Sequence, residues 1–232
     1  MKTKIITMLT VIMLVPVCKV QAVLDIYSDA VIQEGDYYDT VVNVYDTPPD
    51  HTTVDMTGGF VHNLRSYDSS IINMTGGEIL TLEAYKTSTA NVSGGNIAGL
   101  EAWDHSIVNF SDDARALSLG SGGDFGTVNM TGGSTEFLGA GYSGTINIYA
   151  GLVTDSLNAW DYATVNIFGY DLVKTSSGGR YGCGQVYGFF ADGLAFTIEF
   201  STFETYSHVN LIPEPGSLLL IAFGALLLKR KR

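Results

Sequence analysis

The stretch Thr53-Val54-Asp55-Met56-Thr57-Gly58-Gly59 decides the fold, because the chain repeats it. Its core is an Asn or Asp, an apolar residue, a Thr or Ser and two glycines, and it recurs at Asn73, Asn91 and Asn129. Weaker copies begin at Asp25, Asn43, Asn109, Asn147 and Asn166, and successive anchors are 18, 12, 18, 18, 18, 20, 18 and 19 residues apart. A period this regular predicts a repeat architecture.

Each copy alternates apolar and polar residues ahead of its glycines. Val54 and Met56 in one copy, and Ile146 and Ile148 in another, are apolar at a spacing of two. This is the period of a strand with one buried and one solvated face. The paired glycines permit the positive φ of a tight corner. We therefore expect a strand and a corner in every repeat, with the Asn column facing outward.

A second apolar stretch follows each glycine pair. It is marked by a leucine and, a few residues later, by an aromatic residue: Leu64, Leu82, Leu100, Leu138 and Leu157, and then Tyr67, Tyr85, Trp103, Tyr142 and Trp160. A unit of about 18 residues cannot bury its own apolar side, whereas stacked units bury a continuous core. The sequence predicts an all-β parallel β-solenoid, a single-stranded β-helix of about 18-residue coils. An antiparallel sandwich is the alternative.

The repeats set the expected domain organisation. Residues 23–168 hold the solenoid repeats, and residues 169–211 break the pattern with a Gly-rich and aromatic composition. Because a solenoid needs an atypical end to cover its open edge, we interpret 169–211 as a β-rich cap.

The first 22 residues have the composition of a secretory signal. Lys2 and Lys4 precede an apolar run from Ile5 to Val17, and Ala22 offers a cleavage site. The run is shorter than the roughly 20 residues that span a bilayer, so we expect a cleaved signal helix over 1–22 rather than a permanent anchor. An exported location follows from this interpretation.

Residues 212–232 combine a proline-rich motif, an apolar segment and a basic stop. The motif is Pro213, Glu214, Pro215, Gly216 and Ser217, the apolar run is 218–228, and the stop is Lys229, Arg230, Lys231 and Arg232. The basic end favours a cytoplasmic position. In this order the three parts resemble the PEP-CTERM sorting domain of exported proteins in Gram-negative bacteria that make exopolysaccharide. The resemblance implies a C-terminal membrane helix and processing by an exosortase. An ordinary tail anchor is the alternative.

The body between the two ends is strongly acidic. The whole chain has a net charge of −12, but seven of its 12 basic residues lie in the end segments. Residues 23–212 therefore keep five basic against 23 acidic residues, a net of −18. Nucleic-acid binding depends on neutralising phosphates with Lys and Arg, so this composition excludes nucleic acid as a partner.

The motifs of common catalytic sites are missing from the sequence. No Gly-x-Ser-x-Gly elbow, phosphate-binding loop or zinc spacing occurs, so we expect neither a cofactor nor a metal. Acidic residues at similar repeat positions (Asp68, Asp104 and Asp161), with Arg65 or Arg115, leave a carbohydrate-active β-helix enzyme as an alternative. A flat Thr–Asn ladder that binds a glycan or another repetitive surface is a second alternative.

Together these features predict an exported, non-enzymatic protein of the cell surface or extracellular matrix. Its expected partners are an exosortase-type enzyme, the membrane before processing, and exopolysaccharide in a biofilm. The alternative function is a carbohydrate-active enzyme or a glycan-binding module.

Overall fold

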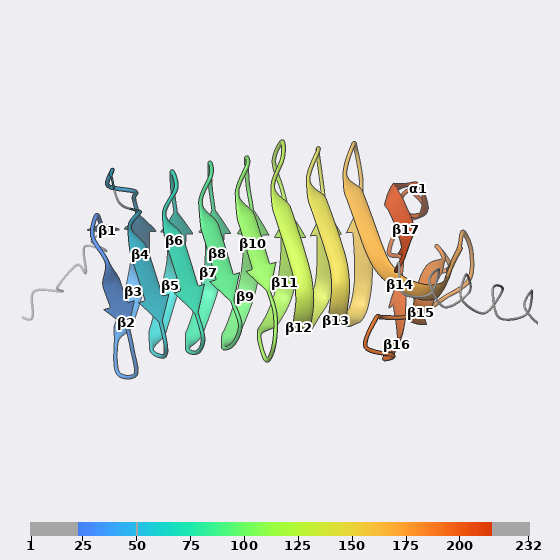
Figure 1. Cartoon of the computed structure of the whole chain (residues 1–232), viewed down its shortest axis with the longest axis horizontal. Coiled ribbons are helices and arrows are strands. Elements are labelled where there is room, and N and C mark those ends of the chain that lie inside the picture. The colour runs from blue at the N-terminus through green and yellow to red at the C-terminus, as the bar shows by residue number, and fades with distance from the viewer. Residues whose placement is uncertain (1–22, 50, 215–232) are drawn as a thin grey trace, which may run out of the picture.

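The computed structural model describes residues 23–49 and 51–214, in which the chain winds into coils stacked along one axis (Figure 1). Strands of neighbouring coils pair in parallel and in register, as Thr53 does with Ile71 and Ile71 with Thr89. There are about eight turns of about 19 residues each. The predicted parallel β-solenoid is therefore confirmed, and the antiparallel sandwich is wrong for the stack.

One side of the solenoid carries the Asn column, and we call it the Asn side. Its strands are short, because each begins after a turn and ends at a corner, which in most coils contains glycine and after Phe110 contains Asp112. They are β2 (Ala30–Ile32), β4 (Thr53–Met56), β6 (Ile71–Met74), β8 (Thr89–Val92), β10 (Ile107–Phe110) and the first parts of β12 (Thr127–Ala140), β13 (Thr145–Ala159) and β14 (Thr164–Thr175).

The other side carries the leucine column, and we call it the Leu side. Its strands are β1 (Leu24–Ile26), β3 (Tyr37–Val44), β5 (Phe60–Ser66), β7 (Glu78–Ala84), β9 (Asn96–Ala102), β11 (Arg115–Ser121) and the second parts of β12 and β13. The pairing skips one residue in the middle of these strands, for example His62 and Leu80.

The core between the two sides consists of apolar columns, one residue per coil. On the Asn side Val54 and Met56 are fully buried, as are their equivalents in the following coils. On the Leu side the leucine column is continuous and fully or almost fully buried: Leu64, Leu82, Leu100, Leu119, Leu138 and Leu157. Stacking thus buries what no single coil could bury.

The glycine corners are required by both backbone and packing. Gly77 has a φ of 95°, a region that glycine enters without steric cost. A Cβ there would lie 2.6 Å from the terminal methyl of Met56 in the preceding coil. The Gly-Gly pair therefore lets the chain turn and lets a core methionine of the adjacent coil fill the space below.

The opposite corner is a short turn with an aromatic first residue. Tyr27, Tyr45, Tyr67, Tyr85 and Trp103 stack on one another there, with ring centroids 5.1–6.3 Å apart. The stack does not continue into the next two coils, where Gly122 and Gly141 occupy the equivalent positions. Tyr142, expected in this aromatic column, instead lies at the second turn position, with a φ of 51°.

Two of the weaker repeat anchors belong to the other side of the solenoid. Asp25 pairs with Asn43, and Asn43 pairs with Arg65 on the Leu side. The Asn column begins instead at Asp55, which follows Val31 of the first coil. Assigning Asp25 and Asn43 to the Asn column was therefore wrong. The sequence around Asn43 resembles the repeat, but Asn43 precedes Asp55 by only 12 residues, which is about half a coil. The two residues therefore lie on opposite sides of the solenoid.

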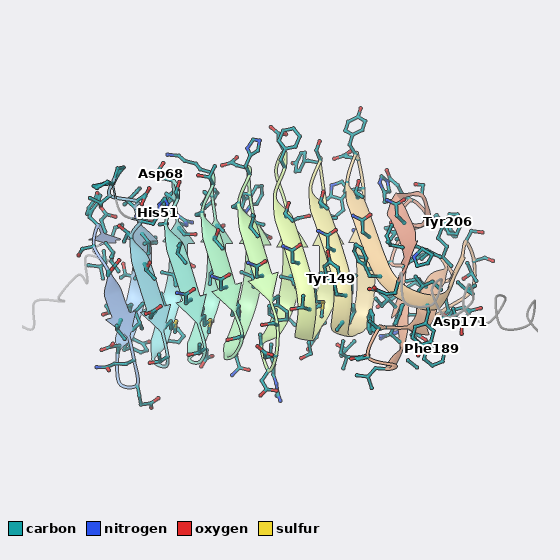
Figure 2. The ribbon with its side chains drawn as sticks, viewed as in Figure 1. His51, Asp68, Tyr149, Asp171, Phe189 and Tyr206 are labelled. Atoms are coloured by element: carbon teal, nitrogen blue, oxygen red, sulfur yellow. The ribbon has the colours of Figure 1, made fainter. Side chains whose placement is uncertain are left out.

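After the last full coil the chain folds back on the end of the stack. The second part of β14 pairs antiparallel with β15 (Gln185–Phe189), which pairs with β16 (Ala195–Glu199). A short helix, α1 (Thr205–His208), then leads into β17 (Val209–Pro213), which lies parallel to β14 and adds one more rung to the Asn side. Phe189 and Tyr206 are labelled at this end of the molecule (Figure 2).

Candidate functional site

The proline-rich motif starts on the last rung of the solenoid. Pro213 is the final residue of β17 and is exposed, and the Glu214 amide donates to the carbonyl of Gly169 at 2.9 Å. The rest of the motif and the basic stop (Pro215, Gly216, Ser217, Lys229, Arg230, Lys231 and Arg232) lie outside the described residues, as do 1–22 and the membrane helix expected in 212–232. Residues 23–49 and 51–214 contain no helix that is long and apolar enough to cross a membrane.

The acidic column noted in the sequence forms part of the turns. Asp68, Asp104 and Asp161 have φ values of 59°, 54° and 59° and occupy the second turn position. Asp tolerates this left-handed conformation better than most residues. Asp68 lies at the outer edge of the coils (Figure 2), and Lys86 separates it from Asp104 along the axis. The column is therefore explained by the turn geometry.

The two arginines proposed to handle an acidic substrate lie apart. Arg65 is on the Leu side, where its Nε donates to Glu83 at 2.7 Å. Arg115 begins β11 and lines a separate shallow hollow with Glu78 and Glu136. Among the described residues neither arginine forms an ion pair with a turn aspartate, and Asp68 pairs with Lys86 instead, so the acid-and-arginine groove of the enzyme alternative is not assembled.

The histidines are also dispersed. His51 lies 3.4 Å from Asp46 near the N-terminal end, His105 stacks on Phe125, and His208 Nδ1 lies 2.8 Å from the carbonyl of Ala163. Within the described part of the chain, no three His, Cys, Asp or Glu side chains lie together as a metal site would require.

The Asn column is a continuous hydrogen-bonded ladder. Each side-chain amide donates to the oxygen of the preceding coil at 2.8–3.1 Å, from Asn210 to Asn166 and onward to Asp55. Every asparagine in the series thus uses one donor within the ladder, and all but Asn210 also use an acceptor there. These contacts stabilise the stack and leave fewer groups for an external surface.

A groove that the sequence did not indicate crosses the Leu side. The outward column of Arg65, Glu83 and Glu101 continues as Gly120 and Gly139 before it reaches Asn158. Two adjoining hollows of about 160 and 420 Å³ lie over these glycines and share Ser118, Gly139 and Trp160. We call them together the glycine groove. Its lining includes Glu101, Trp103, Tyr142, Asp155, Asn158, Trp160 and Tyr181.

The two tryptophans cover glycines of the intervening coils. A Cβ on Gly122 would lie 3.2 Å from the ring of Trp103, and one on Gly141 would lie 2.4 Å from the ring of Trp160. The aromatic column is therefore interrupted over two coils, with an indole on each side of the gap. Trp160 lies between the two hollows and is 37% exposed.

Glu101 gives one end of the groove its electrostatic character. Burial raises the pKa of its carboxyl, and the neighbouring Glu83 raises this pKa further. The Trp103 indole lowers the pKa, but by less. The buried indole N–H of Trp103 lies close to the carboxyl of Glu101. Its geometry is too poor for a hydrogen bond to this carboxyl or to any other described group. Glu101 is thus a partly desolvated acceptor at the groove wall.

The opposite wall of the groove is formed by β13 and by the segment around Arg180 and Tyr181 that follows β14. Val153 and Ser156 of β13 face Thr135 and Phe137 of β12, so β13 has one extra residue, a bulge of the kind that redirects a side chain. Asp155 lies in this bulge and accepts hydrogen bonds from Arg180 and Tyr181 of the C-terminal segment. The far wall is therefore fixed by contacts between the stack and its end.

Only indirect signals of this groove exist in the sequence. Gly120 and Gly139 are departures from a charged column, and that column becomes visible only when the Leu-side register is known.

Comparison of the chain with protein-family models, with curated proteins and with solved structures finds no similar protein, either for the body or for the tail.

Proposed function

We propose that the chain is an exported, non-enzymatic protein of the cell surface or extracellular matrix. It is sorted through its PEP-CTERM-like tail by an exosortase-type enzyme and is associated with exopolysaccharide. The observation that carries the proposal is the place of the motif. β17 ends at Pro213, so a cut after this strand would release a solenoid with all its rungs in place.

The acidic surface also suits an exported rod. Four of the five cations of residues 23–212 are held by partners: Arg65 by Glu83, Lys86 by Asp68, Lys174 by two carbonyls and Arg180 by Asp155. The remaining negative charge keeps such rods apart in solution. A non-enzymatic role agrees with the turn position of the aspartates and the scattered histidines.

Mass spectrometry of the protein from its native host tests the sorting proposal. We expect a mature form that begins at Val23 and lacks Lys229–Arg232. The variants Glu214→Gln and Pro215→Ala should accumulate with the basic end intact. Glu204→Gln is the control, because Glu204 is an exposed glutamate outside the motif. A wild-type product that retains Lys229–Arg232 would contradict the proposal.

An activity assay tests the non-enzymatic part. The purified mature protein is incubated with neutral and acidic bacterial and algal polysaccharides, and reducing ends or unsaturated products are measured. We expect no turnover. Product formation that is lost in a variant of Glu101 or Asp155 would favour the enzyme alternative.

A further inference from the structure

The glycine groove is a local exception in an otherwise regular column. Three successive coils place Arg65, Glu83 and Glu101 on the outer face of the Leu side, and the next two place Gly120 and Gly139 there. The step from Glu101 to Asn158 covers three coil spacings of 4.7–4.9 Å, or about 14 Å. The exception therefore creates an elongated hollow along the stacking axis.

The backbone does not require glycine at position 139. Gly139 is not among the glycines with positive φ. An added Cβ would meet only the Trp160 ring, at 3.9 Å, which is ordinary van der Waals contact. At Gly77, in contrast, φ is positive and an added Cβ would clash with Met56. Packing thus permits a side chain at 139, and its absence keeps the floor of the groove open.

The walls suit the faces of sugar rings. Trp160, Tyr142 and Tyr181 are exposed aromatic residues of the groove. The half-buried Trp103, which stacks on Tyr85, also lines the first hollow. Large exposed apolar side chains gathered in one hollow are typical of a binding surface. A pyranose offers a flat apolar C–H face and an equatorial rim of hydroxyl groups, so it can use an indole and polar neighbours together.

The polar groups of the groove are mainly acceptors and neutral groups. Glu101 and Asp155 carry carboxylates, and Ser118 and Asn158 add a hydroxyl and an amide. The nearby Arg180 is paired with Asp155. Sugar hydroxyls can donate to these acceptors, whereas a uronic acid or sulfate would meet like charge without a free cation.

We propose that the glycine groove binds a short stretch of an uncharged polysaccharide, aligned along the coil axis and packed against the exposed Trp160, with Trp103 lining the end of the groove. The proposal rests on the proposed surface role for its biological setting and names the class of glycan in that role. Its chemistry depends only on the folded solenoid, so the test does not require sorting.

Intrinsic fluorescence tests the proposal directly, because the chain has two tryptophans and both line the groove. The purified mature protein is titrated with cello-oligosaccharides, laminarin oligosaccharides and galactomannan, and with polygalacturonate as the acidic probe. We expect a saturable change in emission with at least one neutral glycan. Polygalacturonate should bind at least about tenfold more weakly, a difference of about 1.4 kcal/mol.

Three variants separate the groove from general effects. Gly139→Gln fills the floor but keeps both indoles, and Trp160→Ala removes one wall. We expect each to weaken binding by more than about tenfold. Thr81→Gln adds bulk to the same side outside the groove, and affinity should not change. If Trp160→Ala fails to fold by circular dichroism, Gly139→Gln alone decides, with affinity electrophoresis as the second readout.

Two results would overturn the inference. One is the absence of binding by all three neutral glycans, and the other is wild-type affinity in folded Gly139→Gln. Equal or tighter binding of polygalacturonate would also contradict it. Failure of the sorting proposal has a different signature, a retained Lys229–Arg232 end in a protein that still binds the glycan. The two proposals can therefore fail separately.

Discussion

At the residue scale, the turn aspartates have a conformational explanation that can be tested. Asp161 has a φ of 59°, which glycine adopts freely and a β-branched residue resists. We expect Asp161→Gly to leave the midpoint of urea unfolding nearly unchanged. Asp161→Val should lower the free energy of unfolding by about 1–2 kcal/mol. An equal loss of unfolding free energy in both variants would mean that the carboxylate itself is needed.

Glu101 predicts a pH dependence of stability. Its pKa is raised by burial and by Glu83, so the folded state favours the protonated carboxyl. Its contribution is therefore most favourable at acidic pH and is lost as pH rises through the raised pKa. Glu101→Gln should be at least as stable as wild type at pH 7, with an advantage that shrinks toward pH 4. Urea unfolding at both values measures this, and an advantage that grows in acid would refute it.

At the scale of the element, the Asn ladder has a direction. Each amide donates toward the N-terminal end, and the last acceptor is Asp55. An aspartate suits this end because it accepts from Asn73 and has no amide left to satisfy. The preceding rung has Val31 at this place, which offers no side-chain acceptor. The single acidic member of the column therefore terminates it.

The direction of the ladder predicts opposite outcomes for two similar exchanges. Asn91→Asp removes the donor to Asn73 from the middle of the ladder and should lower the free energy of unfolding by about 1–3 kcal/mol. Asp55→Asn keeps the acceptor for Asn73 at the end of the ladder, and we expect a change within about 0.5 kcal/mol. Comparable losses in urea unfolding would show that the ladder is not directional.

The elements could be predicted from the sequence because their pattern is local. Alternation around Asn73 and the Gly76-Gly77 corner indicate a strand and a turn without reference to the rest of the chain. The local pattern did not show on which side of the solenoid the strands of the first coils lie. Asp25 and Asn43 imitate the repeat locally, and only pairing with Arg65 shows that they lie on the Leu side.

At the scale of the whole molecule, the parts that the sequence did not predict depend on distant contacts. The glycine groove arises from side chains that are missing in register, at Gly120 and Gly139, and from Asp155, which the C-terminal segment holds. The return of β17 to the Asn side is equally remote, since Asn210 bonds to Asn166 across 44 residues. A repeat period identifies equivalent coils but not the end that closes them.

A half-buried amine, that of Lys174, holds α1 and β17 against the end of the stack. Lys174 Nζ donates to the carbonyls of Tyr206 and Val209 at 3.0 and 2.6 Å and lies 4.5 Å from the ring centre of Tyr206. Partial burial lowers the pKa of this amine, and the two carbonyls accept its hydrogen bonds. Lys174→Met keeps most of the apolar length of the side chain and removes the amine with both of its hydrogen bonds, which should loosen α1 and β17.

In a solenoid each coil contacts mainly its neighbours, so this loosening should stay at the end. Hydrogen exchange should become faster at the amides of β17 in Lys174→Met, while β6 and β8 exchange as in the wild type. Lys86→Met is the control, because the ion pair of Lys86 with Asp68 is exposed and such pairs contribute little. Faster exchange along the whole stack would mean that the coils unfold as one cooperative unit, and that the C-terminal end limits the stability of all of them.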